Sequence, residues 1–297
     1  MNYPEFIYKL QKALQERVGE KAKVCLSMVE RLNGTNEDAL VIEKDGKELH
    51  LRIYLRDLYE ESGMESNLEA CVEGLYHLCE EEPFVGRGDI PESWQSAKRR
   101  IELRLVKKKW NMEMLREVPY KEYLDFAVIF VVFLAENEGV HATLTVSQEL
   151  MKKWEIELEE LWEAAQENLK KESFLVKSIE SVLGDVIGEE AMEEDVKEQC
   201  GALYVLSNTR QCYGARVILR KDILRRFAKE RNNNLYLLPC SIHEFLALED
   251  DGVYEGSGLK NLVCEVNEES GMIKQEQWLS DSVYYYDREK DEVRIVV

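Results

Sequence analysis

The residues best suited by type and spacing to carry out a reaction lie in the C-terminal part of the chain, in the stretch Cys240-Ser241-Ile242-His243-Glu244. They place a thiol, a hydroxyl, an imidazole and a carboxylate within five positions. A hydroxyl or thiol beside an imidazole can act as a nucleophile, because the imidazole can take its proton. The stretch is therefore the first candidate for a hydrolase-type site.

Geometry limits which of these groups can work together. On an extended strand, residues two apart share a face, so Ser241 can lie beside His243 while Cys240 and Glu244 point the other way. Ser241 and His243 would still need an orienting acid and an oxyanion hole from elsewhere, and no Gly-x-Ser-x-Gly motif supplies one. We favour a structural role, in which Ser241 binds backbone groups where the strand turns and His243 is a half-buried, hydrogen-bonded side chain. No catalytic residue is assigned, and Ser241 and His243 remain the candidates.

Two other groups of polar residues invite a similar comparison. Asp281 beside Ser280 is typical of a turn or a helix N-cap. His77 and Cys79, with Cys71 eight residues before Cys79, could supply metal ligands, but a two-residue spacing on a helix points side chains apart. We expect packing there, and we expect neither a metal nor a cofactor anywhere in the chain.

A local concentration of basic residues interrupts an otherwise acidic sequence. Its members are Lys98, Arg99, Arg100, Arg104, Lys107, Lys108 and Lys109. They could bind a phosphorylated or acidic ligand, but neither aromatic interleaving nor a phosphate loop accompanies them. The Gly-x-Gly in Phe84–Asp89 lacks the later residues of such loops. We expect a solvated face that pairs with acidic groups of the same protein.

Composition narrows the classes of partner. The chain of 297 residues carries 59 acidic and 39 basic side chains, a formal charge of −20. Such a charge repels nucleic acid and anionic membranes, so a protein or small-molecule partner is expected. The seven scattered cysteines are typical of free thiols in a reducing compartment, and no leader is evident at the N-terminus. We expect a cytoplasmic protein.

The element that organises the fold is an apolar run at residues 126–135, Phe-Ala-Val-Ile-Phe-Val-Val-Phe-Leu-Ala. It is shorter than the ~20 residues of a membrane span, and its β-branched and aromatic content predicts a central strand. The alternation that follows over 140–146 predicts a hairpin partner. The class of the segment 95–117 is open; a strand starting near Ile101 after a short helix is favoured.

The rest of the chain predicts an α+β fold with mainly antiparallel sheets, flanking amphipathic helices and two lobes. Residues 3–18 read as a helix followed by three strands, and the C-terminal part reads as strand pairs alternating with helices, including a strand at 215–219. We expect an N-terminal lobe over 1–184, an acidic linker or exposed helix over 185–199, and a C-terminal lobe over 200–297.

Several stretches resemble a bacterial family known as domain of unknown function 5688. They are Val118-Pro119-Tyr120 through Leu124-Asp125 to Ala127-Val128, the helices of Trp154 to Asn168, Gly214-Ala215, Leu237 to Glu244, and Leu279-Ser280-Asp281-Ser282-Val283-Tyr284. The resemblance covers most of the chain beyond residue 118. Where serine is expected in that family this chain has Cys240, which counts against a role that needs a hydroxyl there. The resemblance implies a bacterial cytoplasmic protein and brings no assigned activity.

Three functions follow as hypotheses. The leading one is a non-catalytic binding or regulatory protein, because many structural motifs but no complete catalytic set are present. The second is a hydrolase-type enzyme that uses Ser241 and His243. The third is an acidic decoy that occupies a nucleic-acid-binding partner, suggested by the charge of −20.

Overall fold

The computed structural model describes residues 1–43, 51–61, 68–80, 91–137, 140–187, 203–268 and 273–296. The fold is α+β with antiparallel sheets, as the sequence predicts. The chain forms two compact units, one of Met1–Ser93 with Phe133–Leu144, and one of Trp94–Val132 with Thr145–Val297.

The first unit packs helices on a three-stranded sheet. Helix α1 (Tyr3–Val18) begins at Asn2, whose side chain accepts a hydrogen bond from the Glu5 backbone N–H at 3.0 Å. Strands β1 (Lys23–Glu30), β2 (Asn36–Glu43) and β3 (Leu51–Tyr54) pair in that order, and α2 (Leu55–Glu61) and α3 (Leu68–Glu80) follow. Apolar residues at helical spacing on α1 meet alternate residues of the sheet, and the core includes Phe6, Leu10, Leu14, Val24 and Leu40. The predicted helix over 3–18 and the three strands after it are confirmed.

The first sheet of the second unit is built around the apolar run. Strand β6 (Phe126–Asn137) lies between β4 (Ile101–Lys107) and β5 (Tyr120–Tyr123). Beyond Val132 it belongs to the first unit, as does most of β7 (Val140–Thr145), which pairs with it. All its residues from Phe126 to Val132 are buried, which explains the lack of polar alternation. The predicted central strand and its hairpin partner are confirmed. The strand favoured at Ile101 is also confirmed, and the short helix α4 (Trp94–Ala97) precedes it.

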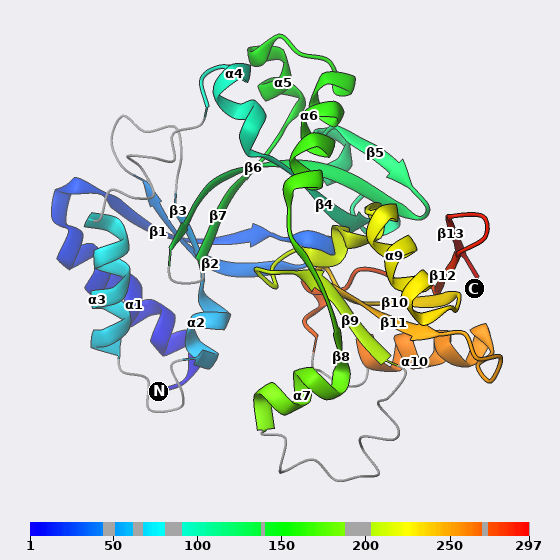
Figure 1. The fold of residues 1–297 in the computed structure, drawn as a ribbon. Coiled ribbons are helices and arrows are strands. Elements are labelled where there is room, and N and C mark those ends of the chain that lie inside the picture. The colour runs from blue at the N-terminus through cyan, green and yellow to red at the C-terminus, as the bar shows by residue number, and fades with distance from the viewer. Residues whose placement is uncertain are drawn as a thin grey trace. The chain divides into compact units, whose positions relative to one another are not determined.

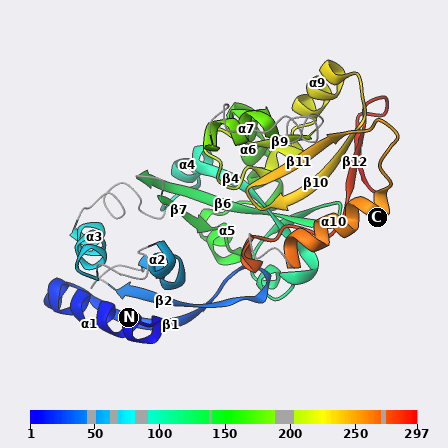
Figure 2. The same ribbon diagram turned by 90° about the horizontal axis from the view of Figure 1, so that it is seen from below.

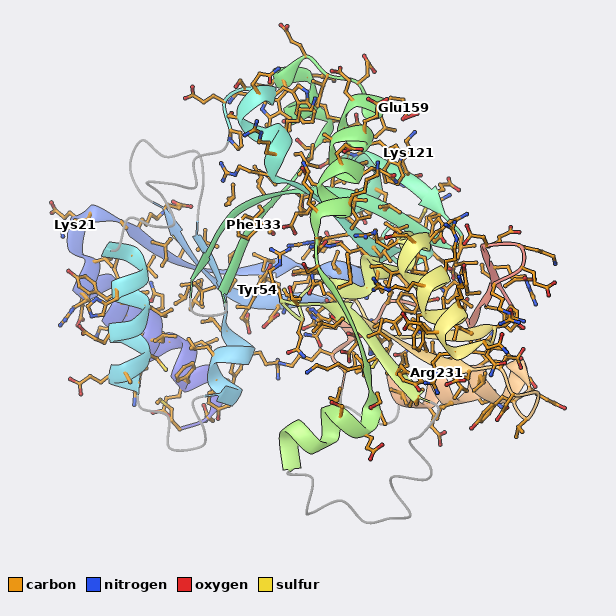
Figure 3. The ribbon with its side chains drawn as sticks, viewed as in Figure 1. Lys21, Tyr54, Lys121, Phe133, Glu159 and Arg231 are labelled. Atoms are coloured by element: carbon orange, nitrogen blue, oxygen red, sulfur yellow. The ribbon has the colours of Figure 1, made fainter. Side chains whose placement is uncertain are left out.

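Two helices cover this sheet in the second unit. They are α5 (Gln148–Trp154) and α6 (Leu158–Lys171), which lie beside β4 and β6 (Figure 1). Ser147 caps α5 by accepting from the Leu150 N–H at 3.1 Å. Lys121 on β5 and Glu159 on α6 point toward each other, with Nζ and Oε1 2.6 Å apart (Figure 3).

The second sheet of this unit has six antiparallel strands in the order β13, β12, β10, β11, β9, β8. Their bounds are β8 (Phe174–Ser178), β9 (Leu203–Asn208), β10 (Leu235–Ser241), β11 (Glu244–Glu249), β12 (Tyr284–Asp287) and β13 (Glu292–Ile295). Helix α10 (Gly256–Glu268) packs on one face through Leu259 and Val263, and α9 (Lys221–Arg231) lies on the other (Figure 2). Helix α7 (Ile179–Ile187) follows β8.

One predicted strand is wrong. Residues Gly214–Leu219 form a 3-10 helix, η7, in place of the strand expected at 215–219. The acidic stretch 185–199 lies outside the described residues beyond residue 187, so the division into lobes at that stretch stays a prediction. The Gly-x-Gly stretch at 84–89 also lies outside them.

Candidate functional site

The turn between β10 and β11 holds Ser241 and His243 and is not a continuous strand. The ladder between β10 and β11 shifts register between Pro239 and Ser241, and Ser241 pairs with Glu244. The Ser241 hydroxyl, on a residue that is 7% exposed, accepts a hydrogen bond from the His243 backbone N–H at 3.0 Å. The Cys240–Glu244 stretch therefore contains a turn between two strands, and is not the extended strand on which Ser241 and His243 would share a face. Ser241 contacts the backbone of His243, and no hydrogen bond joins its hydroxyl to the imidazole in the described contacts.

The imidazole of His243 points to a different segment. Its Nδ1 accepts a hydrogen bond from the backbone N–H of Tyr213 at 3.1 Å, and the two rings lie 5.3 Å apart. A neutral imidazole that accepts through Nδ1 carries its proton on Nε2. The carbonyl of His243 accepts from the Ser207 hydroxyl at 2.9 Å. His243 thus holds the 207–214 segment against the turn.

Cys240 lies before this turn, and its environment disfavours a thiolate. Burial, reinforced by the neighbouring Glu244 carboxylate, raises the pKa of the Cys240 thiol to about 12. A thiol nucleophile requires the opposite shift. Cys240 has the properties of a packing residue.

Gly214 allows the 207–214 segment to pack closely against the turn, because it has no side chain. A Cβ atom at this position would lie 2.3 Å from Ser207 Oγ, 2.5 Å from the Asn208 nitrogen and 2.7 Å from the His243 carbonyl oxygen. No side chain fits there without a shift of the backbone. Tyr213, just before it, has φ of 52°, a left-handed conformation that is uncommon for a non-glycine residue.

Next to this segment lies a buried ionic group that we call the Arg216 cluster, made of Glu102, Glu172, Arg210 and Arg216. Arg216 is 1% exposed and binds both carboxylate oxygens of Glu172, at 2.7 Å through Nε and 2.6 Å through Nη2. Its Nη1 donates to Glu102 at 3.0 Å and to the Leu103 carbonyl at 2.9 Å, and Arg210 binds the other oxygen of Glu102 at 2.8 Å. Burial opposes ionisation of Glu102, but Arg216 and Arg210 outweigh it and hold the pKa of that carboxyl below its ordinary value. The cluster joins β4, the end of α6 and η7.

A second buried polar group forms where β4 ends. We call it the Lys107 cluster; it consists of Lys107, Asp125, Ser280, Asp281, Ser282 and Tyr284. Lys107 is 5% exposed, and its ammonium donates to Asp125 Oδ2 at 2.8 Å, Ser280 Oγ at 2.8 Å and Asp281 Oδ1 at 2.5 Å. Asp125 lies in the turn between β5 and β6, where Leu124 has φ of 55°. The cluster therefore joins the two sheets of the second unit.

Further hydrogen bonds fix the oxygens of the Lys107 cluster. Tyr284, fully buried, donates to Asp125 Oδ1 at 2.5 Å and also lies 2.8 Å from Ser280 Oγ. Ser282 donates through its hydroxyl to Asp125 Oδ2 at 3.0 Å and through its backbone N–H to Ser280 Oγ at 3.1 Å. Burial opposes ionisation of Asp125, but bonds from Lys107 and Tyr284 outweigh it and lower the pKa of that carboxyl. Burial and Asp125 together raise the pKa of Tyr284.

The Lys107 cluster has the residue types of a Ser–Lys site but a different geometry. A lysine that serves as a base must be able to lose its proton, and a serine nucleophile must reach its substrate. Lys107 instead donates to two carboxylates and to Ser280, so all three of its N–H donors are in use within the cluster. Ser280 is fully buried, and its hydroxyl oxygen accepts from the Lys107 ammonium and the Ser282 backbone N–H, with the Tyr284 hydroxyl 2.8 Å away.

Sequence reasoning missed both clusters for an identifiable reason. The basic residues of 98–109 do not form one solvated face, because Lys107 is buried and the half-buried Arg104 stacks 3.5 Å from the centre of the Tyr213 ring. Lys108 does pair with Glu122 at 2.6 Å, as expected for this region. Ser280 does accept from a backbone N–H two residues on, so the expected turn is present, but its link to Lys107 spans 173 positions. No local pattern announces such a link.

Metal ligands do not gather in the described ranges. No three His, Cys, Asp or Glu side chains there converge as a metal site would require. His77 pairs with Glu73, with Nε2 and Oε1 3.2 Å apart, and Cys79 is buried in the core of the first unit.

Comparison with known proteins places the chain in a family. The model of a family of unknown function, DUF5688, matches residues 3–288. The chain belongs to this family. The matched range includes both buried clusters and the 241–244 turn, and the family carries no assigned activity. No curated protein and no solved structure matches the chain. Within the described part of the chain, no helix combines the length and apolarity needed to cross a bilayer.

Proposed function

We propose that this DUF5688 protein is a non-catalytic binding or regulatory module. The observation that carries the proposal is that the Ser280 hydroxyl is buried and hydrogen-bonded within the Lys107 cluster. This serine has a lysine and a tyrosine within 2.8 Å, yet it is fully buried, and its oxygen already accepts hydrogen bonds from the Lys107 ammonium and the Ser282 N–H. A group held in this way stabilises the fold and offers no attacking atom to a substrate.

The geometry at Ser241 and His243 also supports a non-catalytic role. A serine hydrolase needs the imidazole to accept the serine proton. Here Nδ1 of His243 accepts from the Tyr213 N–H, and the Ser241 hydroxyl accepts from a backbone N–H. The hydrolase that uses Ser241 and His243 remains the alternative, because its two residues are adjacent in the fold.

The charge of the chain supports a partner with a basic surface. The formal charge is −20, and the exposed side of α6 carries Glu159, Glu160, Glu163 and Glu167. This negative charge repels the phosphates of nucleic acid, and it attracts a positively charged protein or small molecule. An acidic decoy of a nucleic-acid-binding protein is the extreme form of this proposal. The proposed setting is the bacterial cytoplasm, in keeping with six free thiols among the described cysteines.

The enzymatic alternative is tested with purified full-length protein and three variants, Ser241→Ala, His243→Ala and Ser280→Ala. Each is treated with a fluorophosphonate probe and with panels of ester, amide and phosphoester substrates. We expect no labelling or turnover that depends on these residues. Activity that is lost in Ser241→Ala or His243→Ala, while circular dichroism shows a folded protein, would overturn the non-catalytic proposal.

The decoy form is tested by affinity capture from a bacterial lysate at moderate salt, with and without competing DNA. Recovery of basic nucleic-acid-binding proteins that DNA displaces supports it. Capture without any basic protein removes it and leaves the broader binding proposal to other partners.

A further inference from the structure

The three oxygen atoms around Lys107 Nζ have the chemistry of a cation site. Two are carboxylate oxygens, from Asp125 and Asp281, and the third is the Ser280 hydroxyl, all at 2.5 to 2.8 Å. Carboxylate and hydroxyl oxygens are the donors that hard cations prefer. A lysine ammonium has three N–H donors and no acceptor, so each donor meets one of these oxygens.

A second layer of hydrogen bonds orients these oxygens, as it does around metal ions. Tyr284 and Ser282 bind Asp125, and the Ser282 N–H binds the Ser280 hydroxyl. The buried Asn267 donates to the Ser280 carbonyl at 3.1 Å. The oxygen set is therefore held by groups other than the lysine.

We propose that Asp125, Ser280 and Asp281 form a cation-binding site that the protein fills with its own Lys107 ammonium group. The side chain of Lys107 is 7% exposed, whereas those of Asp125 and Asp281 are 23% and 50% exposed. The oxygen set thus borders solvent, and a small cation can reach it once the lysine side chain is shortened. The ligand class is a hard metal cation such as Mg²⁺ or Ca²⁺, or a small primary ammonium ion.

The Lys107 ammonium group links segments of two different sheets within the second unit. Lys107 ends β4, Asp125 precedes β6, and Ser280 and Asp281 precede β12. One positive charge therefore holds segments of two different sheets together. A free metal ion would do the same work but would depend on its concentration, whereas a side chain is always present.

The experiment uses full-length Lys107→Ala in buffers of matched ionic strength. Thermal unfolding is followed with added MgCl₂, CaCl₂ or methylammonium chloride, with NaCl as the reference. We expect the variant to unfold several degrees below the wild type, and at least one of these cations to recover much of that loss. The wild type should not respond, because its site is filled.

Two controls isolate the site. Lys109→Ala removes an exposed lysine two positions away, so it should behave like the wild type. The double variant Lys107→Ala with Asp281→Asn should lose the recovery, because one of the two carboxylates is gone. If Lys107→Ala responds to every cation no more than the wild type does, the proposal is wrong.

A second readout does not depend on stability. Trp110 lies with its ring centre 5.4 Å from Lys107 Nζ, so a terbium ion in the lysine's place would receive energy from this tryptophan. We expect strong terbium emission on tryptophan excitation in Lys107→Ala, and much weaker emission in the wild type and in the double variant. If Lys107→Ala does not fold alone, it is refolded from urea with each cation. Failure to regain structure with every cation contradicts the proposal.

Discussion

The backbone N–H of Tyr213 donates a hydrogen bond to Nδ1 of His243 at 3.1 Å. This bond links two segments thirty positions apart and uses a lone pair that a general base would need. Replacing His243 with alanine removes the acceptor, so we expect a loss of about 1–3 kcal/mol in the free energy of unfolding. Urea unfolding measures it. A variant as stable as the wild type would show that the bond contributes little to the fold.

Gly214→Ala tests the close approach of the 207–214 segment to the turn. The new methyl group would meet three atoms at 2.3 to 2.7 Å, two of them in the backbone, so we expect a loss of about 1–3 kcal/mol. Gly258→Ala in α10 is the matched control, because its added methyl meets nothing within 4 Å. Equal stability of the two variants would contradict the tight packing at Gly214.

Arg216→Met tests the Arg216 cluster. It leaves the carboxylates of Glu102 and Glu172 without their buried partner, and we expect a loss of about 3–5 kcal/mol in the free energy of unfolding. Arg226→Ala removes an exposed arginine 4.0 Å from Glu230 and should change stability by less than about 1 kcal/mol. Denaturant unfolding of both variants, compared with the wild type, decides. Similar losses for the two would mean that Arg216 acts as a surface ion pair.

Asp125→Asn tests the pH dependence of the Lys107 cluster. The pKa of Asp125 is lowered in the folded protein, so its contribution to stability is complete above the ordinary aspartate pKa of about 3.9 and is lost as pH falls through the folded value. We expect the variant to be less stable than the wild type at neutral pH, and the difference to shrink in acid. Unfolding in urea at a series of pH values measures this. A difference that stays constant throughout the acid range would contradict it.

Cys240 should resist alkylation in the folded protein. With a pKa of about 12, its thiolate fraction near pH 8 is far below that of an ordinary thiol. We expect labelling by iodoacetamide, followed by peptide mass spectrometry, to be at least about 100-fold slower than in urea. Comparable rates in the two conditions would show that the thiol is not held in this environment.

Local pattern was enough to predict much of the fold. The run at 126–135 predicted a central strand because β-branched and aromatic residues favour a sheet buried on both faces, and β6 has that role. The helix over 3–18 followed from a cap residue and regular apolar spacing. These signals are contained within each element.

The errors arise where a distant partner decides the local structure. Residues 215–219, Ala-Arg-Val-Ile-Leu, have the apolar and β-branched content of a strand. Gly214, however, is packed against the turn and Arg216 binds Glu172, 44 positions away, and the segment forms a 3-10 helix. Lys107 and Arg104 read as surface charges because lysine and arginine are seldom buried without partners. Their partners lie on other elements, and no spacing in the sequence connects them.

The separation along the chain between Lys107 and Ser280 also sets an order of events during synthesis. Lys107 and Asp125 leave the ribosome long before residues 280–284. Ser280 follows Lys107 by 173 positions and Asp125 by 155 positions. Chains fold from the N-terminus as they emerge, so the first sheet of the second unit can form while the lysine and the aspartate have only each other. The last segment then completes the cluster. Completion of the cluster is therefore a late step of synthesis, and in a nascent chain stalled before residue 280 the lysine and Asp125 would lack the partners that Ser280, Asp281, Ser282 and Tyr284 supply.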